Sequence, residues 1–285
     1  DNNAINYTFY NTLSWGKSFG GNHNFNVMVG TEYKRYDGKN FQAKKRDYFN
    51  NQLTALSVGA TMEDISGGSS LELLFSYFGR ITYDYKEKYL IDVTARYDGS
   101  SKFAPENRWG WFPSVSFGWN LGNEPFMEDS GIDLKFRASY GRTGNQEGIS
   151  PWAYHAKMSG GKNYGGQSGI AVSDFGNRNL RWEKADQYDV GFDLAFLKGK
   201  VNMIFDIYQK NTFDLLYNKP VAAHTGTTST LSNIGSIRNR GVEFTLNTHF
   251  NFGKHFSWLS QFNICLLYTS PSPRDGATSR MPSSA

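Results

Sequence analysis

The amino-acid sequence predicts an all-β fold: part of an antiparallel transmembrane β-barrel, with about ten strands in an open sheet. Apolar and polar residues alternate over runs of roughly ten residues, which is the length that a tilted strand needs to cross a bilayer. Short and long breaks between these runs take turns along the chain. Aromatic residues make up 16% of the chain and are spread along it, as in barrels with aromatic girdles.

The clearest pattern is a β-hairpin over residues 187–208. Large apolar residues occupy every second position on both sides of the break Lys198-Gly199-Lys200, so that each strand has one apolar face. The residues that we expect to face lipid are Val190, Phe192, Leu194, Val201, Met203 and Phe205.

The first five strands are predicted from the same alternation, each with its own apolar face. These faces are Ile5, Tyr7, Phe9, Leu13 and Trp15; Phe25, Val27, Val29, Thr31 and Tyr33; Leu73, Phe75, Tyr77, Ile81, Tyr83 and Tyr85; Tyr89, Ile91, Val93, Ala95 and Tyr97; and Trp111, Val115, Phe117, Trp119 and Leu121.

Five further strands complete the prediction. Their apolar faces are Leu134, Phe136, Ala138 and Tyr140; the two arms of the hairpin above; Val242, Phe244, Leu246, Phe250 and Phe252; and Phe256, Trp258, Phe262 and Ile264.

The connections decide between a barrel and a soluble β-sandwich. Short breaks are expected near 16–24, 86–88, 122–131, 198–200 and 253–255, and long ones near 37–70, 98–109, 143–183 and 209–240. Outer-membrane barrels have tight periplasmic turns and long external loops, whereas a Greek-key sandwich has no reason to put its long connections at one end. Since half a barrel has two free edges, we expect the first and last strands to remain unpaired with each other.

Composition excludes several classes of protein. The 30 basic and 26 acidic residues give a net charge of +4, which is no footprint for nucleic acid. The sequence contains no run of 18 apolar residues, so no membrane helix is expected, and its mean hydropathy is −0.55. Because it opens with Asp1-Asn2-Asn3 and has no signal peptide, we interpret the chain as an internal piece of a longer protein.

The last residues differ in character from the rest. From Cys265 onward the sequence is CLLYTSPSPRDGATSRMPSSA, in which alternation stops and Pro, Ser and Arg dominate. This segment resembles a translated sequencing adapter. We therefore expect residues 1–264 to be barrel and residues 265–285 to be a disordered tail with no ordered contacts.

Several long phrases resemble one family, the SusC/RagA TonB-dependent outer-membrane transporters of Bacteroidetes-type bacteria, in the C-terminal part of their barrel. They are SYFGRITYDYKEKYLIDVTARYDGSSKFAPENRWGWFPSVSFGWNLGNEPFM at 76–127, LKFRASYGRTGNQ at 134–146, NLRWEKADQYDVGFDL at 179–194, IYQKNTFDLLYNKPV at 207–221 and NIGSIRNRGVEFTLN at 233–247.

The resemblance implies a location in the bacterial outer membrane and a plugged barrel of about 22 strands. It also implies import of oligosaccharides or peptides, with a SusD-like surface lipoprotein as lid and with energy from the TonB complex. The family's signal sequence, TonB-contacting segment and plug do not occur in these residues, so we expect the chain to be a fragment of the transporter.

The sequence gives no reason to expect an enzyme, a metal site or a cofactor. The five histidines show no metal-ligand spacing, and no pair of carboxylates is singled out. Binding is more plausible, because aromatic rings suit the flat faces of sugars. In the long break 143–183 we expect Trp152, Tyr154 and Tyr164 to contact substrate, although loop aromatics can also pack on one another or against the lid.

One alternative from another class stays open at this point. A soluble, secreted, β-rich carbohydrate-binding module could show the same strands. In a barrel the apolar faces point outward to lipid, whereas in a sandwich they are buried against each other.

Overall fold

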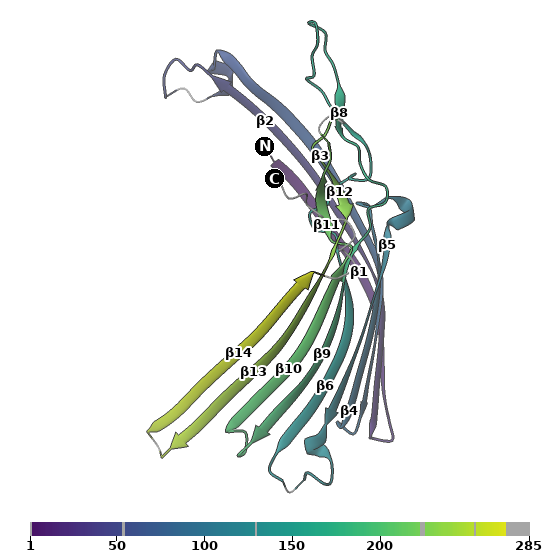
Figure 1. Ribbon diagram of the computed structural model, residues 1–285, viewed down its shortest axis with the longest axis vertical. Coiled ribbons are helices and arrows are strands. Elements are labelled where there is room, and N and C mark those ends of the chain that lie inside the picture. The colour runs from purple at the N-terminus through teal and green to yellow at the C-terminus, as the bar shows by residue number, and fades with distance from the viewer. Residues whose placement is uncertain (1, 53–54, 129, 223–225, 254, 272–285) are drawn as a thin grey trace, which may run out of the picture.

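The computed structural model describes residues 2–52, 55–128, 130–222, 226–253 and 255–271. Ten strands form one curved antiparallel sheet in which each strand pairs with the next of the ten along the chain (Figure 1). In sheet order they are β1 (Asn2–Phe19), β2 (His23–Arg46), β3 (Thr61–Tyr85), β4 (Tyr89–Ser100), β5 (Trp109–Asn120), β6 (Asp133–Asn145), β9 (Glu183–Phe196), β10 (Val201–Phe213), β13 (Ser236–Phe252) and β14 (Phe256–Pro271).

Smaller elements lie in the connections. Within the described residues, two short hairpins pair β7 with β8 and β11 with β12, and three single-turn 3-10 helices occur. Their bounds are β7 Lys157–Ser159, β8 Ala171–Asp174, β11 Leu216–Pro220, β12 Ser229–Asn233, η1 Leu56–Val58, η2 Pro105–Asn107 and η3 Leu121–Asn123. In the described part of the chain, no helix has the length and apolar character needed to cross a membrane.

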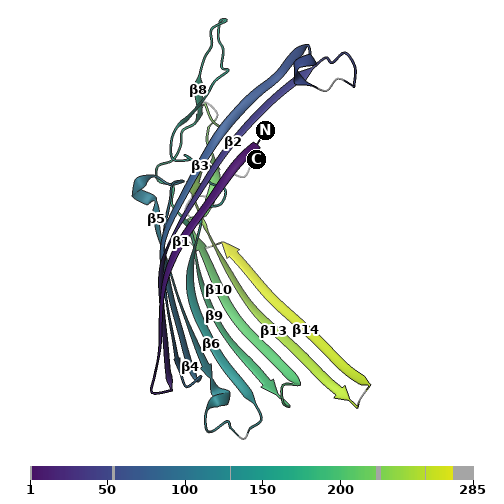
Figure 2. The ribbon, with the colours of Figure 1, turned by 180° about the vertical axis from the view of Figure 1, so that it is seen from behind.

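The predicted fold class is confirmed. All ten predicted strands are present in the main sheet, and β1 and β14 stand at its two ends, each paired on one side. The sheet is therefore open, as Figures 1 and 2 show from front and back. No second large sheet covers it among the described residues, which rules out the sandwich.

The two ends of the sheet differ as predicted. The short turns all lie at one end, the lower end in Figure 1, and the long connections lie at the other. Several of these turns use left-handed backbone, among them Gly20 and Gly21 between β1 and β2, Lys86 and Glu87 between β3 and β4, and the stretch Leu197–Gly199 between β9 and β10. A left-handed turn matches the twist of the strands that it joins.

One predicted connection is wrong in extent. The stretch 37–70 is mostly strand: β2 and β3 continue as a paired ribbon as far as Arg46 and Thr61, with a register shift at Lys44/Lys45. The ribbon rises beyond the other strands of the main sheet in both views (Figures 1 and 2). The alternation fails there because polar residues and glycines such as Gly67 and Gly68 occupy both faces, while the backbone ladder needs no apolar side chains.

The predicted end of the last strand, at Ile264, is also wrong. β14 continues to Pro271, and Cys265 pairs with Glu243 of β13 in the same ladder. The run Leu266-Leu267-Tyr268 suits a strand and its backbone amides are free to pair, so the ladder extends beyond the point where strict alternation stops. The rest of the predicted tail, residues 272–285, lies outside the described residues.

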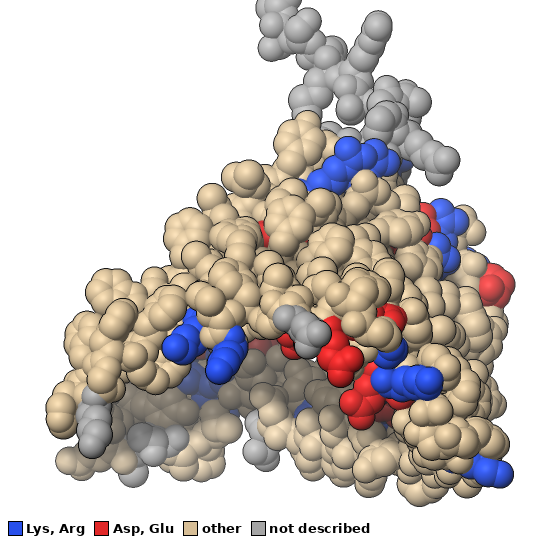
Figure 3. Space-filling view, turned by 90° about the horizontal axis from the view of Figure 1, so that it is seen from below, with Lys and Arg blue, Asp and Glu red and all other residues tan. Residues whose placement is uncertain are grey.

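The two faces of the sheet carry different side chains. The outer face is apolar and open: Val190 and Phe192 of the predicted lipid face are 41% and 42% exposed, while Val201 beside the lower turn is covered. Cross-strand partners such as Phe192 and Phe205 share this face. Seen from below, many of the charged side chains lie around the hollowed inner side, and long stretches of the periphery carry none (Figure 3).

Candidate functional site

The inner face of the sheet is a polar wall. It is lined by the residues that alternate with the apolar ones, because successive side chains of a strand point to opposite faces. A hollow of about 340 Å³ on this wall is lined by residues that include Asn26, Thr82, Asp92, Ser116 and Arg137. Such a surface offers hydrogen-bond donors and acceptors to a hydrated solute.

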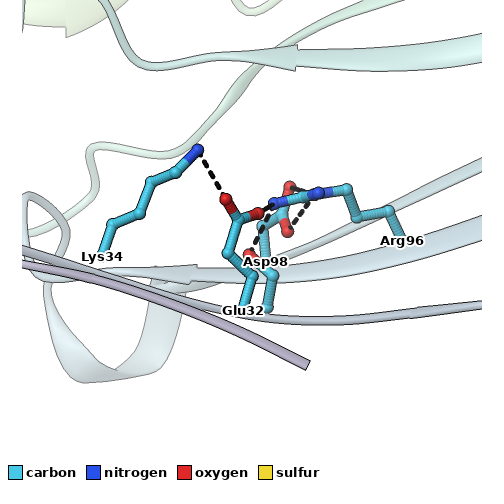
Figure 4. A network of polar contacts seen from close by, with 5 residues as sticks. Glu32, Lys34, Arg96 and Asp98 are labelled. Carbon is cyan, nitrogen blue, oxygen red and sulfur yellow. Dashed lines mark hydrogen bonds and ion pairs between the residues drawn. The ribbon is translucent and has the colours of Figure 1, made fainter. Parts of the chain in front are cut away.

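The upper part of this wall is organised by Arg96 on β4 (Figure 4). Its Nε donates to both carboxylate oxygens of Asp98, at 2.7 and 3.0 Å, and its Nη2 contacts Glu32 of β2 and the hydroxyl of the fully buried Ser76. Lys34 forms a 2.7 Å ion pair with Glu32. The network ties β2, β3 and β4 together and satisfies its own charges.

A second arginine organises the lower part of the wall. Arg137 on β6 makes two hydrogen bonds to Asp193 of β9, at 2.9 and 2.8 Å, and one of 2.9 Å to Asp206 of β10. This fork spans three strands, as the planar guanidinium allows. Gly191 lies directly beneath, and a Cβ there would collide with the Asp206 carboxylate.

The upper ends of the strands enclose a small hydrophobic core, here called the loop core. It comprises Phe103, Phe112, Ile149, Ala153, Leu180 and Trp182, with Leu74, Leu216 and Leu231 packed against it. Phe112 and Leu74 belong to strands of the main sheet, and the others come from three long connections. A glycine is needed at position 144, because the ring of Phe112 lies where a Cβ would be.

Polar contacts join the same long connections. The indole of Trp182 donates to the carbonyl of Arg108 at 2.9 Å, and Arg178 forms an ion pair with Glu106 at 3.1 Å. Asn177 donates to the carbonyl of Leu231 at 3.0 Å. The connections 98–109, 143–183 and 209–240 therefore form one packed body above the sheet.

The three predicted ring contacts take different positions. Trp152 is 45% exposed and its φ is 63°, in the left-handed region. Tyr154 is buried at 8% and lies against the ring of His155, with centroids 4.2 Å apart. Tyr164 is 91% exposed at the tip of the hairpin that contains β7 and β8, where it bridges to Gln167.

Sequence reasoning missed the two arginine networks and the loop core. The strand pattern could have indicated the networks, since Glu32, Arg96 and Arg137 all alternate with lipid-facing positions. Trp182 is one of several aromatic residues in the long break 143–183, but nothing in the neighbouring sequence shows that it is buried with Phe103. Among the described residues, no three His, Cys, Asp or Glu side chains come together in a way that could hold a metal ion.

The outer face carries two aromatic girdles at the heights where an apolar band would end. In the lower one Tyr89 stacks between Tyr85 and Trp119, at 6.3 and 5.9 Å. In the upper one Trp109 stacks on Tyr97 at 4.7 Å and on Tyr77 at 6.3 Å. The girdles and the apolar faces between them define a membrane-spanning band.

Comparison with protein families gives a match over residues 1–283 to the β-barrel of TonB-dependent receptor-like proteins. Among curated proteins, TonB-dependent receptor P3 of Formosa agariphila is 37% identical over 270 residues, which is 92% of this chain and 27% of that protein. TonB-dependent receptor SusC of Bacteroides thetaiotaomicron is 32% identical over 272 residues, 91% of this chain and 26% of SusC. The chain thus spans about a quarter of the length of these relatives.

Solved structures give the same result. The RagAB peptide transporter matches with a TM-score of 0.88 and 27% identity, over 95% of this chain and 30% of that one. The sequence match, the relatives and the open, two-faced sheet agree: the chain belongs to the TonB-dependent receptor family, close to SusC and RagA, and forms part of its outer-membrane β-barrel.

Proposed function

We propose that this chain is part of the wall and outer mouth of an active importer that takes oligosaccharides or peptides across the outer membrane. The observation that carries the proposal is the match to RagAB, a peptide transporter, over 95% of the chain at a TM-score of 0.88. In the full-length protein a plug fills the barrel, the TonB complex supplies energy and a SusD-like lipoprotein closes the mouth. No catalytic role is proposed.

The polar inner wall is evidence for a cargo that is hydrated and forms hydrogen bonds. The charges of Arg96 and Arg137 are met by neighbouring carboxylates, so the wall has many hydrogen-bonding groups without a strong field of one sign. Sugars and peptide backbones share this need for hydrogen bonds, and the wall therefore fits both cargo classes.

The comparison with two states of RagAB supports a barrel wall of fixed shape. The chain matches the 'closed-closed' state of RagAB with a TM-score of 0.88 and its 'open-open' state with 0.86. The near equality favours a barrel wall that keeps its shape while other parts of the transporter move.

The rings in the long connection 143–183 are the proposed contacts for cargo or lid. Trp152 and Tyr164 present exposed rings, and Tyr154 supports the local loop from within. A tryptophan with positive φ is strained, and strain held in a loop favours a role in binding.

The test uses the full-length protein that contains this chain. A strain lacking it should lose growth on its cargo, supplied either as an oligosaccharide mixture or as a peptide mixture, and depletion of TonB should give the same loss. Growth unchanged on both mixtures, or uptake that does not need TonB, would contradict the proposal.

The ring contacts are tested with Trp152→Ala and Tyr164→Ala. Each should weaken cargo binding or lid association about fivefold, which is roughly the effect of losing one aromatic contact. The matched control is Phe126→Ala, a ring 69% exposed in the turn between β5 and β6 at the opposite end. If the control weakens binding as much as the two loop variants do, the binding end has been assigned wrongly.

A further inference from the structure

The outer face of β6, β9, β10 and β13 changes character in three successive rows. Residues paired across neighbouring strands form each row, two positions above the previous one. From bottom to top, the rows are Ala138, Val190, Ile207 and Val242; Tyr140, Tyr188, Gln209 and Arg240; and Arg142, Asp186, Asn211 and Arg238. The upper limit of the apolar band therefore lies between Val242 and Arg240.

The charges above this limit are unevenly matched. Asp186 is held by Arg142 through two hydrogen bonds of 2.6 and 2.7 Å. Arg238 and Arg240 donate only to amide oxygens, of Asn211 at 3.0 Å and of Gln209 at 2.8 Å. Within the described part of the chain, neither of these two arginines forms an ion pair.

Two unpaired guanidiniums on one face have a simple ligand chemistry. Alternate residues of a strand lie about 7 Å apart, so the two groups can hold one phosphate or two neighbouring ones. Their side-chain Nε atoms are already fixed by the two amides, which orients the remaining donors. A guanidinium pairs with phosphate through a planar fork. Lys184, one row higher on the same face, adds a further cation.

The position of Arg238 and Arg240 indicates whether the phosphate is free in solution or belongs to a lipid headgroup. The long connections of an outer-membrane barrel face the exterior, so this limit of the band meets the outer leaflet. An anion held here must lie beside acyl chains that cover Val190, Ile207 and Val242. A free phosphate has no apolar part to cover these side chains, whereas a lipid headgroup brings its chains with it.

We propose that Arg238 and Arg240, seated on Asn211 and Gln209, form a binding site for the phosphate groups of an outer-leaflet glycolipid. The site lies on the outside of the barrel and does not involve cargo. It anchors this part of the barrel at a fixed depth, since cationic clusters at a membrane boundary bind anionic headgroups.

The experiment uses the full-length protein in detergent, titrated with diphosphorylated lipid A, with bound lipid counted by native mass spectrometry. The double variant Arg238→Gln/Arg240→Gln should bind the lipid at least about tenfold more weakly. The variant Arg238→Lys/Arg240→Lys keeps the positive charges. Its affinity for the lipid should lie between that of the wild type and that of the double Gln variant. For dephosphorylated lipid A, the wild type and the double Gln variant should have the same affinity.

The matched control is Lys198→Gln, which removes an exposed cation from the turn at the opposite end of the same sheet and should leave lipid binding unchanged. Circular dichroism and cargo binding check that each variant folds. Equal binding of the phosphorylated lipid by the wild type and the double Gln variant would overturn the proposal. So would equal retention of phosphorylated and dephosphorylated lipid by the wild type.

Discussion

The two ends of the sheet connect each strand to the next in different ways. At the lower end the turn from β3 to β4 takes three residues, and hydrogen bonds such as Lys86 N to Asn22 O, at 2.8 Å, join it to its neighbour. At the upper end three long connections bury the loop core and bond to one another. The lower end is held mainly by backbone geometry and the upper end mainly by side-chain packing.

This difference has a functional consequence. A turn fixed by backbone can vary little, whereas a packed body of loops can change its surface residues while its core keeps it in place. Recognition groups concentrate on loops that a rigid scaffold holds. The upper end is therefore the part of this chain to which the proposed function assigns contact with cargo and lid.

The largest expected effect is at the loop core. Trp182→Ala removes a side chain that is 4% exposed and leaves a cavity, so the free energy of opening the loops should fall by about 3–5 kcal/mol. Limited proteolysis of the full-length protein should show cleavage within residues 146–182. Trp152→Ala, at a half-exposed position in the same connection, is the control and should change cleavage little. Equal protection of both variants would show that packing does not hold the upper end.

The next largest effect is expected between the two ends, where lipid should contact the outer face of the sheet. Phe192→Arg places a charge on the outer face and should destabilise the full-length barrel by about 2–4 kcal/mol, measured by unfolding in lipid. Asp193→Arg lies one position along, on the inner face, and places no charge in lipid. It should therefore destabilise the barrel less, although it breaks the hydrogen bonds between Arg137 and Asp193. If the two variants insert into membranes with equal yield, the faces have been assigned wrongly.

The smallest effect is at the lower end and depends on pH. Lys88 donates to Glu124 at 3.0 Å, and Trp119 and Tyr89 donate to the same carboxylate, which together hold the pKa of Glu124 below its usual value. A depressed pKa adds stability that is present above the unfolded pKa, about 4.3 for Glu, and that is lost as pH falls below this value and through the folded pKa.

Thermal unfolding across this pH range is the measurement for Glu124. The wild type should lose more stability on acidification than Glu124→Gln, because the variant has no carboxylate to protonate. Identical pH profiles of the two proteins would mean that the lower end depends on backbone geometry alone.

The sequence predicts the lower end well for a physical reason. A strand shows its two faces in every second residue, and the break at Lys198-Gly199-Lys200 marks a turn locally, so ten strands and five turns follow from neighbouring residues. The ribbon of β2 and β3 was underestimated because it projects beyond the membrane band, where neither face needs to be apolar.

The upper end could not be predicted in the same way. Phe103, Ile149 and Leu180 meet in one core although they are far apart in the sequence, and no local pattern distinguishes a buried loop aromatic from an exposed one. This is why Tyr154, predicted as a ring contact, is buried, whereas Tyr164 is exposed. The Arg96 network has the same origin, since Glu32 and Arg96 lie on strands brought together only by the sheet.

The open edges of the sheet set a condition on how this protein can be made. Along β1 and β14, the backbone groups that point away from the sheet have no strand to pair with in the described part of the chain, and both strands are exposed over almost their whole length. Such an edge is a template for any other strand, including that of a second copy. Synthesised alone, the piece should form chains of sheets rather than monomers, so a monomeric assembly requires further strands to pair with both edges first.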